Sequence, residues 1–334
     1  MAEELVEASG LQTAKDLFAG AAGGVAQVLL GRSDDDDDKK CRDELGAVFA
    51  PFDIVKVRLQ TAAAGDASAL RTAAGIWRNE GPLAFYKGTL TPLLGIGACV
   101  SVQFGAFHQA RRWFEAKNER GHTAAGGGGG SGSSQQLSYS QYYAAGAFAG
   151  VANSVLSGPI EHVRIRLQTQ PHGAARLYAG PLDCVRQLVA KSGGGLAGWG
   201  RGLYRGQVVT VWREAQAYGV WFLTFEWLMN ADARRNGIAR TDVPQYKVAF
   251  YGGLAGEALW LSSYPFDVVK SKMQTDALAP GDQQYRTMRA CFAQIWRTEG
   301  MRGFWRGLAP TLLRAMPVSA GTFAVVEATM RAIN

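Results

Sequence analysis

One ten-residue pattern occurs three times in this chain of 334 residues, and it limits the possible folds more than any other feature. The copies begin at Pro51, Pro159 and Pro265, so successive copies are 108 and 106 residues apart. Each copy has a carboxylate two places after the proline, bases five and seven places after it, and a glutamine nine places after it. Because five residue types do not recur in register by chance, the chain is built from three tandem repeats.

Each copy of the pattern is expected near the end of a long helix. The carboxylates are Asp53, Glu161 and Asp267, the first bases are Lys56, Arg164 and Lys270, and the glutamines are Gln60, Gln168 and Gln274. Proline removes a backbone donor and clashes with the preceding helical turn, so it predicts a kink in each helix. Two glycines four residues apart precede each pattern, as at Gly146 and Gly150, and this spacing lets another helix approach closely.

After the pattern, each repeat continues in the same order. A short amphipathic stretch leads to an aromatic–basic–glycine triplet that opens a second hydrophobic helix, and the triplet glycines are Gly88, Gly206 and Gly307. The repeats therefore predict an all-α fold with six long helices and short helices between them. The expected long helices span residues 14–60 (with an interruption), 89–117, 138–169, 207–231, 245–275 and 308–331.

The predicted domain boundaries follow the repeats, which occupy residues 1–120, 137–236 and 237–334, with a flexible Gly/Ser-rich linker at 121–136. Repeat one is longer than the others between its second glycine and its proline, by a block of residues at roughly 32–49. This block contains five consecutive aspartates. Because adjacent carboxylates cannot lie in hydrocarbon, the block either loops into water or is a gene-model artefact absent from the working protein.

The composition allows a membrane protein and argues against several other classes. Hydrophobic residues make up 47% of the chain, and a helix with lipid on one side and a wet cavity on the other need not be apolar all round. The net charge of +7 fits anionic lipid headgroups better than nucleic acid, since no nucleic-acid module is present. The four cysteines and four histidines lack metal or disulfide spacing, so no cofactor is expected. No nucleophile–base set or phosphate loop repeats or clusters, so an enzyme is not expected. The first residues also lack the apolar core of a secretory signal.

The repeated pattern, followed by Glu-Gly-x4-aromatic-basic-Gly, resembles the signature of the mitochondrial carrier family over nearly the whole chain. The second half of the signature is present at 80–88 and 299–307, whereas repeat two has Ser192-Gly193 in place of Glu-Gly. The resemblance implies a threefold pseudosymmetric barrel of six transmembrane helices in the mitochondrial inner membrane, with both termini facing the intermembrane space. It also implies a monomer that alternates access around one central site and binds cardiolipin at the triplet glycines.

In the family, the acids and first bases of the pattern form a gate on the matrix side. By this resemblance Asp53, Glu161 and Asp267 pair with the first bases of neighbouring repeats, and the three glutamines brace the pairs. The other interpretation treats them as surface pairs three residues apart, each worth a few tenths of a kcal/mol. Their threefold recurrence behind a proline favours the gate, as does the functional role usual for intramembrane charges.

A second gate on the cytosolic side is predicted to be incomplete. The family has aromatic-acid-x-x-base near the ends of its even-numbered helices, and the charges retained here are Arg111, Glu226 and Glu327. Arg111 could pair with either glutamate, but a full ring cannot form because Met229 and Met330 replace bases. Closure on this side should therefore break more easily, although the same residues also fit solvated helix ends.

Three residues are predicted to contact substrate. Arg213 and Glu214 match the Arg–acid pair of the family's amino-acid and carnitine carriers, and Arg314 matches their basic contact on the sixth helix. Arginine would hold a carboxylate bidentately while Glu214 takes an ammonium group. Alternatively, Arg213 and Glu214 satisfy other helices, since adjacent residues point about 100° apart. Glu257 replaces valines of the other repeats and fits either substrate or proton coupling or a pair with a neighbouring helix.

The chain looks most similar to the fungal amino-acid/carnitine branch of the family. An amino acid is the expected substrate and carnitine esters are the second choice. A carrier-like scaffold that transports nothing is the third, because the extra block interrupts repeat one and one gate is incomplete. The sequence does not distinguish exchange from uniport.

Overall fold

The computed structural model describes residues 54–61, 68–81, 84, 90–124, 137–170, 176–277, 282–313 and 315. Within these ranges the regular secondary structure is entirely helical, as the repeats predict. The extra block at 32–49, most of the linker at 121–136, and most of the expected first and sixth long helices lie outside the described residues.

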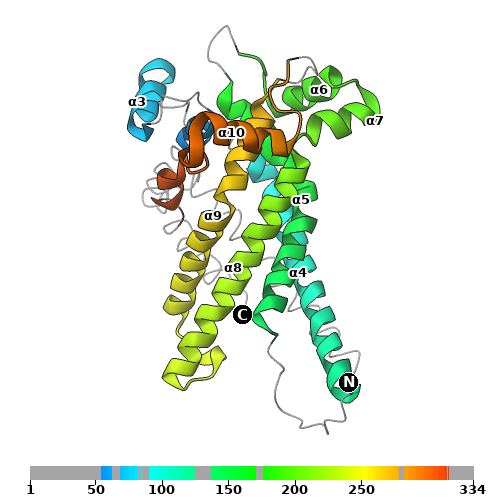
Figure 1. Cartoon of the computed structure of the whole chain (residues 1–334), viewed down its shortest axis with the longest axis vertical. Helices are drawn as coiled ribbons and strands as arrows, with labels where there is room; N and C mark the ends of the chain where they lie inside the picture. The colour runs from blue at the N-terminus through cyan, green and yellow to red at the C-terminus, as the bar shows by residue number, and fades with distance from the viewer. Residues whose placement is uncertain are drawn as a thin grey trace, which may run out of the picture.

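Four long helices form the body of the molecule (Figure 1). They are α4 (Leu90–Ala124), α5 (Tyr139–Thr169), α8 (Gln207–Asn236) and α9 (Gln245–Thr275). Two of them run past their predicted ends, since α4 continues beyond 117 and α8 beyond 231. The reason in α8 is that neither glycine nor proline occurs between residue 231 and Gly237, which ends the helix with a φ of 64°.

Short helices lie between the long ones, and Figure 1 shows α3, α6, α7 and α10 gathered at one end of the bundle. They are α3 (Ala69–Glu80), α6 (Pro181–Lys191), α7 (Gly195–Gly198), η3 (Trp199–Leu203) and α10 (Met288–Gly303). The Glu-Gly element turns the chain at matching places, with a φ of 77° at Gly81 and 63° at Gly300. Repeat two lacks this element, and its longer loop forms α7 and η3 instead.

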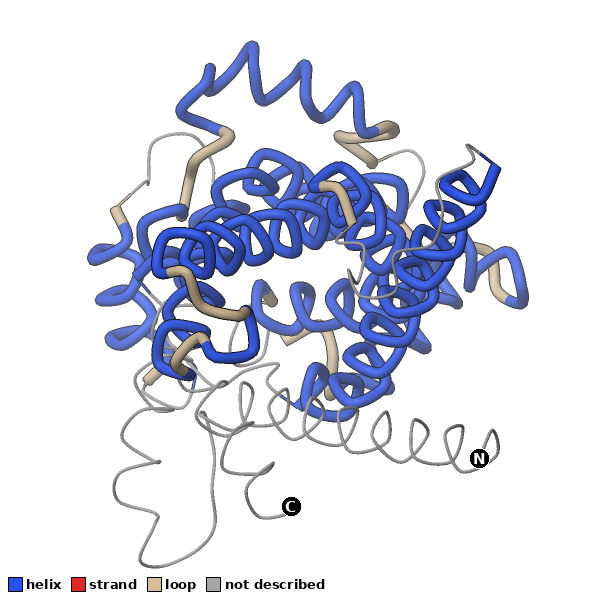
Figure 2. The backbone as a smooth tube through the Cα atoms, turned by 90° about the horizontal axis from the view of Figure 1, so that it is seen from below, coloured by secondary structure: helices blue, strands red, loops and turns tan. Residues whose placement is uncertain are grey.

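The long helices pack in chain order, α4 on α5, α5 on α8 and α8 on α9. Seen along their length in Figure 2, the described helices surround a common axis. The paired glycines of α5 set its close approach to α8, because a Cβ at Gly146 or Gly150 would lie 2.5 or 2.3 Å from a backbone oxygen of α8. The expectation that this glycine spacing admits a neighbouring backbone is confirmed in repeat two.

The two described prolines of the pattern lie inside α5 and α9, which continue to Thr169 and Thr275. The helical segment 54–61 carries the same part of repeat one. All three therefore bring the pattern's bases and glutamines to the end of the bundle that carries the short helices, which we call the gate end. Taken one at a time, none of the helices in the described ranges is both long and apolar enough to cross a membrane.

Candidate functional site

Ion pairs join neighbouring repeats at the gate end. Lys56 Nζ lies 2.8 Å from Asp267 Oδ2, and Lys270 forms an ion pair with Glu161. The base of repeat one thus meets the acid of repeat three, and the base of repeat three meets the acid of repeat two. Asp53, which the sequence predicts as the partner of Arg164, lies outside the described residues.

Gln60 supports one of these pairs from the side. Its amide nitrogen donates to Asp267 at 2.8 Å, and its oxygen accepts a hydrogen bond of 2.8 Å from the Ser271 hydroxyl. Gln168 and Gln274 are equally buried, but their side-chain oxygens have no hydrogen-bond partner among the described residues. Among the hydrogen bonds between described residues, the brace geometry is therefore seen at Gln60.

Arg213 enters the same network from α8. One of its nitrogens lies 3.0 and 3.1 Å from the two carboxylate oxygens of Glu161, and its Nε lies 3.9 Å from Asp267. It also forms an ion pair with Glu214, which accepts a hydrogen bond of 3.1 Å from the Ser157 hydroxyl of α5. The sequence predicts Arg213 as a substrate contact only, and its contact with Glu161 was not predicted. The rotation of α8 about its own axis decides whether Arg213 reaches Glu161, and the local sequence does not specify that rotation.

A cavity of about 80 Å³ lies within these contacts. Its lining includes Lys56, Glu161, Arg213, Asp267 and Trp260, and the Lys56 ammonium lies 4.1 Å from the centroid of the Trp260 ring. Buried charges are costly unless they are paired and hydrogen-bonded, and a small polar cavity lets water share that task. Such pairs hold two helices together yet can exchange partners.

A second layer of pairs lies outside the first in repeats one and three. Arg58, the second base of its pattern, donates to Glu80 at 2.8 Å, and Lys272 pairs with Glu299 in the same way. Arg306 of the triplet also contacts Glu299, at 2.8 Å. In both repeats the glutamate of Glu-Gly ties the long helix to its own short helix.

Repeat two has replaced this arrangement. With Ser192 in place of the glutamate, Arg166 donates to His162 Nε2 at 2.9 Å and to the Asp276 carbonyl at 2.7 Å. Arg205 forms an ion pair of 2.6 Å with the Asp276 carboxylate. Arg166 of the pattern and Arg205 of the triplet therefore both contact the end of α9 in repeat three. The signal that could have revealed this is His162 itself, because the other repeats have aliphatic residues at that place.

The ring of His162 contacts three parts of the molecule. Its Nδ1 lies 3.0 Å from the Leu203 carbonyl, and its Nε2 lies 3.0 Å from the Gln274 carbonyl and 2.9 Å from Arg166 Nε. His162 thus links α5 to η3 and to the end of α9.

At the opposite end of the long helices, the predicted partners are paired differently. Arg111 forms an ion pair of 2.8 Å with Glu115 in its own helix, and Glu226 forms one of 2.5 Å with Arg240. Arg240 lies in η4 (Arg240–Asp242), between α8 and α9. The possible pair of Arg111 with Glu226 is absent from this structure. Glu327, the third residue predicted there, and the substrate residue Arg314 lie outside the described residues.

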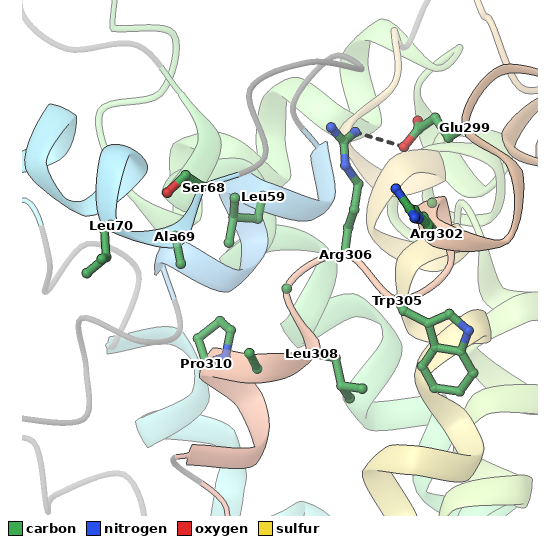
Figure 3. Close-up of a pocket in the computed structure, with 13 residues that line it drawn as sticks. Leu59, Ser68, Ala69, Leu70, Glu299, Arg302, Trp305, Arg306, Leu308 and Pro310 are labelled. Atoms are coloured by element: carbon green, nitrogen blue, oxygen red, sulfur yellow. Dashed lines mark hydrogen bonds and ion pairs between the residues drawn. The ribbon is translucent and has the colours of Figure 1, made fainter.

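Two of the triplet glycines have a left-handed conformation directly before the helix that follows each triplet. Their φ angles are 78° at Gly206 and 82° at Gly307. Gly88 lies outside the described residues. Beside Gly307 is a cavity of about 760 Å³ between repeat one and repeat three (Figure 3). Its lining combines Arg302 and Arg306 with Trp305, Leu308 and Leu70. Basic and apolar groups on one concave surface suit a lipid headgroup with its chains.

The comparisons with known proteins agree with the architecture. A model of the family described as mitochondrial carrier protein matches residues 46–118, 135–233 and 241–334. The mitochondrial glycine transporter YMC1 of Saccharomyces cerevisiae is 39% identical, covering 99% of this chain and 95% of the yeast protein.

Two further relatives are similar over almost their whole length. The glutamate/glycine mitochondrial carrier ymc1 of Schizosaccharomyces pombe is 40% identical, covering 97% of this chain and 96% of its own. The mitochondrial basic amino acids transporter of Bos taurus is 39% identical, covering 95% and 91%. With all three repeats matched and the pattern's charges paired between repeats, this chain belongs to the mitochondrial carrier family.

Proposed function

We propose that this chain moves an amino acid across the mitochondrial inner membrane by alternating access around one central site. Membership of the carrier family supports the transport role, and relatives named for glycine, glutamate/glycine and basic amino acids support the substrate class. The four long helices, with the partly described first and sixth ones, would form a multi-pass barrel of three repeats. In this barrel the gate end faces the matrix.

The observation that carries the proposal is the position of Arg213. Its buried guanidinium lies between Glu161 of the gate network and Glu214, so one cation serves both the site and the gate. A substrate carboxylate is the same kind of partner as the Glu161 carboxylate, and the two therefore compete for Arg213.

This competition would couple substrate binding to opening. In the structure Glu161 has two cations, Lys270 and Arg213. When a substrate carboxylate takes Arg213, Glu161 keeps only Lys270, and the contact between repeats two and three weakens. A ligand shifts a conformational equilibrium only by such differential interactions, and this one acts directly on the gate.

The surroundings of Glu214 favour an amino acid over carnitine. Glu214 is buried and held by Arg213 and Ser157. A primary ammonium can donate hydrogen bonds to such a carboxylate, whereas the quaternary ammonium of carnitine has no N–H to donate. Arg314 would supply a further basic contact from the sixth helix.

We also propose that cardiolipin binds at the triplet glycines of this monomeric carrier. The cavity beside Gly307 supports this, because it adjoins the start of a helix and two arginines (Figure 3). Gly206 begins α8 in the same conformation, and Gly88 is expected to do so in repeat one.

Uptake by proteoliposomes containing the purified protein tests the transport proposal. Labelled glycine, glutamate, lysine, arginine and carnitine would be compared, and we expect uptake of at least one amino acid in excess of carnitine. Arg213→Ala should reduce that uptake about a hundredfold, since losing a buried charged contact costs on the order of 3 kcal/mol.

Arg235→Ala is the matched control, because this arginine is exposed at the far end of α8 and should leave uptake unchanged. Absence of uptake for every amino acid, with Arg213→Ala indistinguishable from the parent, would contradict the proposal. That outcome would instead leave the carrier-like scaffold as the better account.

A further inference from the structure

Glu226 of α8 has a buried carboxylate that is paired with Arg240, a residue outside the family's signature. Its side chain is 7% exposed, and Arg240 Nη2 lies 2.5 Å from its Oε1. Its other oxygen, Oε2, is buried and has no hydrogen-bond partner among the described residues. An acid in this position can accept a second cation, and burial makes the missing partner costly.

Arg240 takes the place of a base that repeat two lacks. The signature expects a base three residues after Glu226, and Met229 stands there. Arg240 instead reaches Glu226 from η4, in the connection to repeat three, and its guanidinium also interacts with Tyr142 of α5. Its side chain is 35% exposed, so it can leave this position without being pulled through a packed core.

Arg111 is the second cation within reach of this group. Phe107 of α4 stacks on Phe222 of α8, with 3.7 Å between ring centroids. Arg111 and Glu226 are each four residues further along these two helices, and both helices run away from the gate end, so the two side chains share one depth. At present Arg111 is paired with Glu115 and remains partly exposed.

We propose that Arg240 is a positioning residue of the transport cycle, which holds Glu226 while the cytosolic side is open and yields it to Arg111 when that side closes. This inference rests on the proposed function. It follows from the state of the structure: the pairs at the gate end are formed, so alternating access leaves the opposite end open. There Glu226 has Arg240 rather than Arg111 as its partner.

Amino-acid exchange by proteoliposomes tests the partner exchange. Arg240→Gln should slow exchange about fivefold or more, because Glu226 then has only Arg111 and the cytosolic-closed state is over-stabilised. Adding Arg111→Gln to that variant should recover part of the rate, since no partner then traps Glu226. A merely structural role would make the two losses additive, and additive losses would overturn the proposal.

Control variants distinguish the effect of the Arg240 charge from that of other charges at the same end of the bundle. Arg240→Lys keeps a cation beside Glu226 and should retain most of the rate, while Arg235→Gln removes an exposed charge from the same end and should change nothing. In a Glu226→Gln background, Arg240→Gln should have little further effect. An equal loss in both backgrounds would show that Arg240 acts through another group.

Thermal unfolding of the same variants in detergent keeps this inference distinct from the proposed function. If the parent protein transports none of the amino acids, the proposed function fails. The Arg240–Glu226 contact should nevertheless appear as non-additive shifts of the melting temperature in the double-mutant cycle. Additive shifts would overturn the contact itself, whatever the parent transports.

Discussion

At the scale of single residues, the three glutamines of the pattern are not equivalent. Gln60 uses both ends of its amide, one on Asp267 and one on Ser271, whereas the oxygens of Gln168 and Gln274 have no hydrogen-bond partner among the described residues. The sequence presents them as identical members of a repeat. Their different surroundings arise because each faces a different neighbouring helix.

Replacing Gln60 by alanine should therefore cost more stability than replacing Gln274. We expect Gln60→Ala to lower the free energy of unfolding by about 2 kcal/mol, because it leaves a buried carboxylate and a buried hydroxyl without a partner. Gln274→Ala, at an equally buried position, is the control and should cost less. Chemical denaturation in detergent measures both, and equal losses would show that Gln60 is no brace.

At the scale of helices, glycine decides how closely α5 and α8 pack. A methyl group at Gly150 would lie 2.3 Å from the Glu214 carbonyl oxygen, so the two helices would have to separate there. Because Glu214 and Arg213 are neighbours in α8, such a separation would also displace the candidate site.

Gly150→Ala should destabilise the protein by about 1–3 kcal/mol through this overpacking. Gly75→Ala in α3 is the matched control, since nothing lies within 4 Å of its added methyl group, and it should be neutral or slightly stabilising. Melting temperatures in detergent compare them, and a Gly150→Ala protein as stable as the control would refute the close-packing account.

The helices of repeat two are also linked across a repeat boundary, through Arg205 and Asp276. Both side chains are buried, and Asp276 additionally accepts from the backbone amides of Gln284 and Tyr285. In repeat three the corresponding arginine, Arg306, contacts Glu299 of its own repeat at 2.8 Å.

A double-mutant cycle of Arg205→Ala with Asp276→Ala should give a coupling energy of about 1–3 kcal/mol. The cycle of Arg205→Ala with Glu299→Ala should give none, because these two residues belong to different clusters. Unfolding free energies supply all the terms. Coupling close to zero in the first cycle would mean that the Arg205–Asp276 link does not hold the two repeats together.

At the scale of the whole molecule, ion pairs at one end of the bundle join repeats far apart in sequence. Lys56 lies in repeat one and Asp267 in repeat three, yet they meet at 2.8 Å. Since each repeat contributes one acid and one base, rigid movement of the repeats can make or break all the pairs together.

Charge exchange tests this linkage. Asp267→Lys should reduce amino-acid exchange by about tenfold or more, because two cations then face each other at the gate end. Lys56→Asp combined with Asp267→Lys should restore part of the rate. If the double variant is no better than either single one, the pair does not serve as a gate. The restored rate should stay below that of the parent, because Arg213 also lies near position 267 and would face the new lysine.

The sequence by itself determined the repeated plan of this protein: helical repeats, the starts of α4, α5, α8 and α9 to within one residue, the ends of α5 and α9, and the acids and bases that recur in each repeat. These follow from periodicity and from residue types that recur in register, which are local properties. The tertiary structure alone decided which partners the charges take, as at Arg213 with Glu161, Glu226 with Arg240, and Arg205 with Asp276. The physical reason is that a buried charge pairs with whatever opposite charge the packing of helices brings within about 4 Å, and that packing depends on helix rotation and on residues far away in the chain.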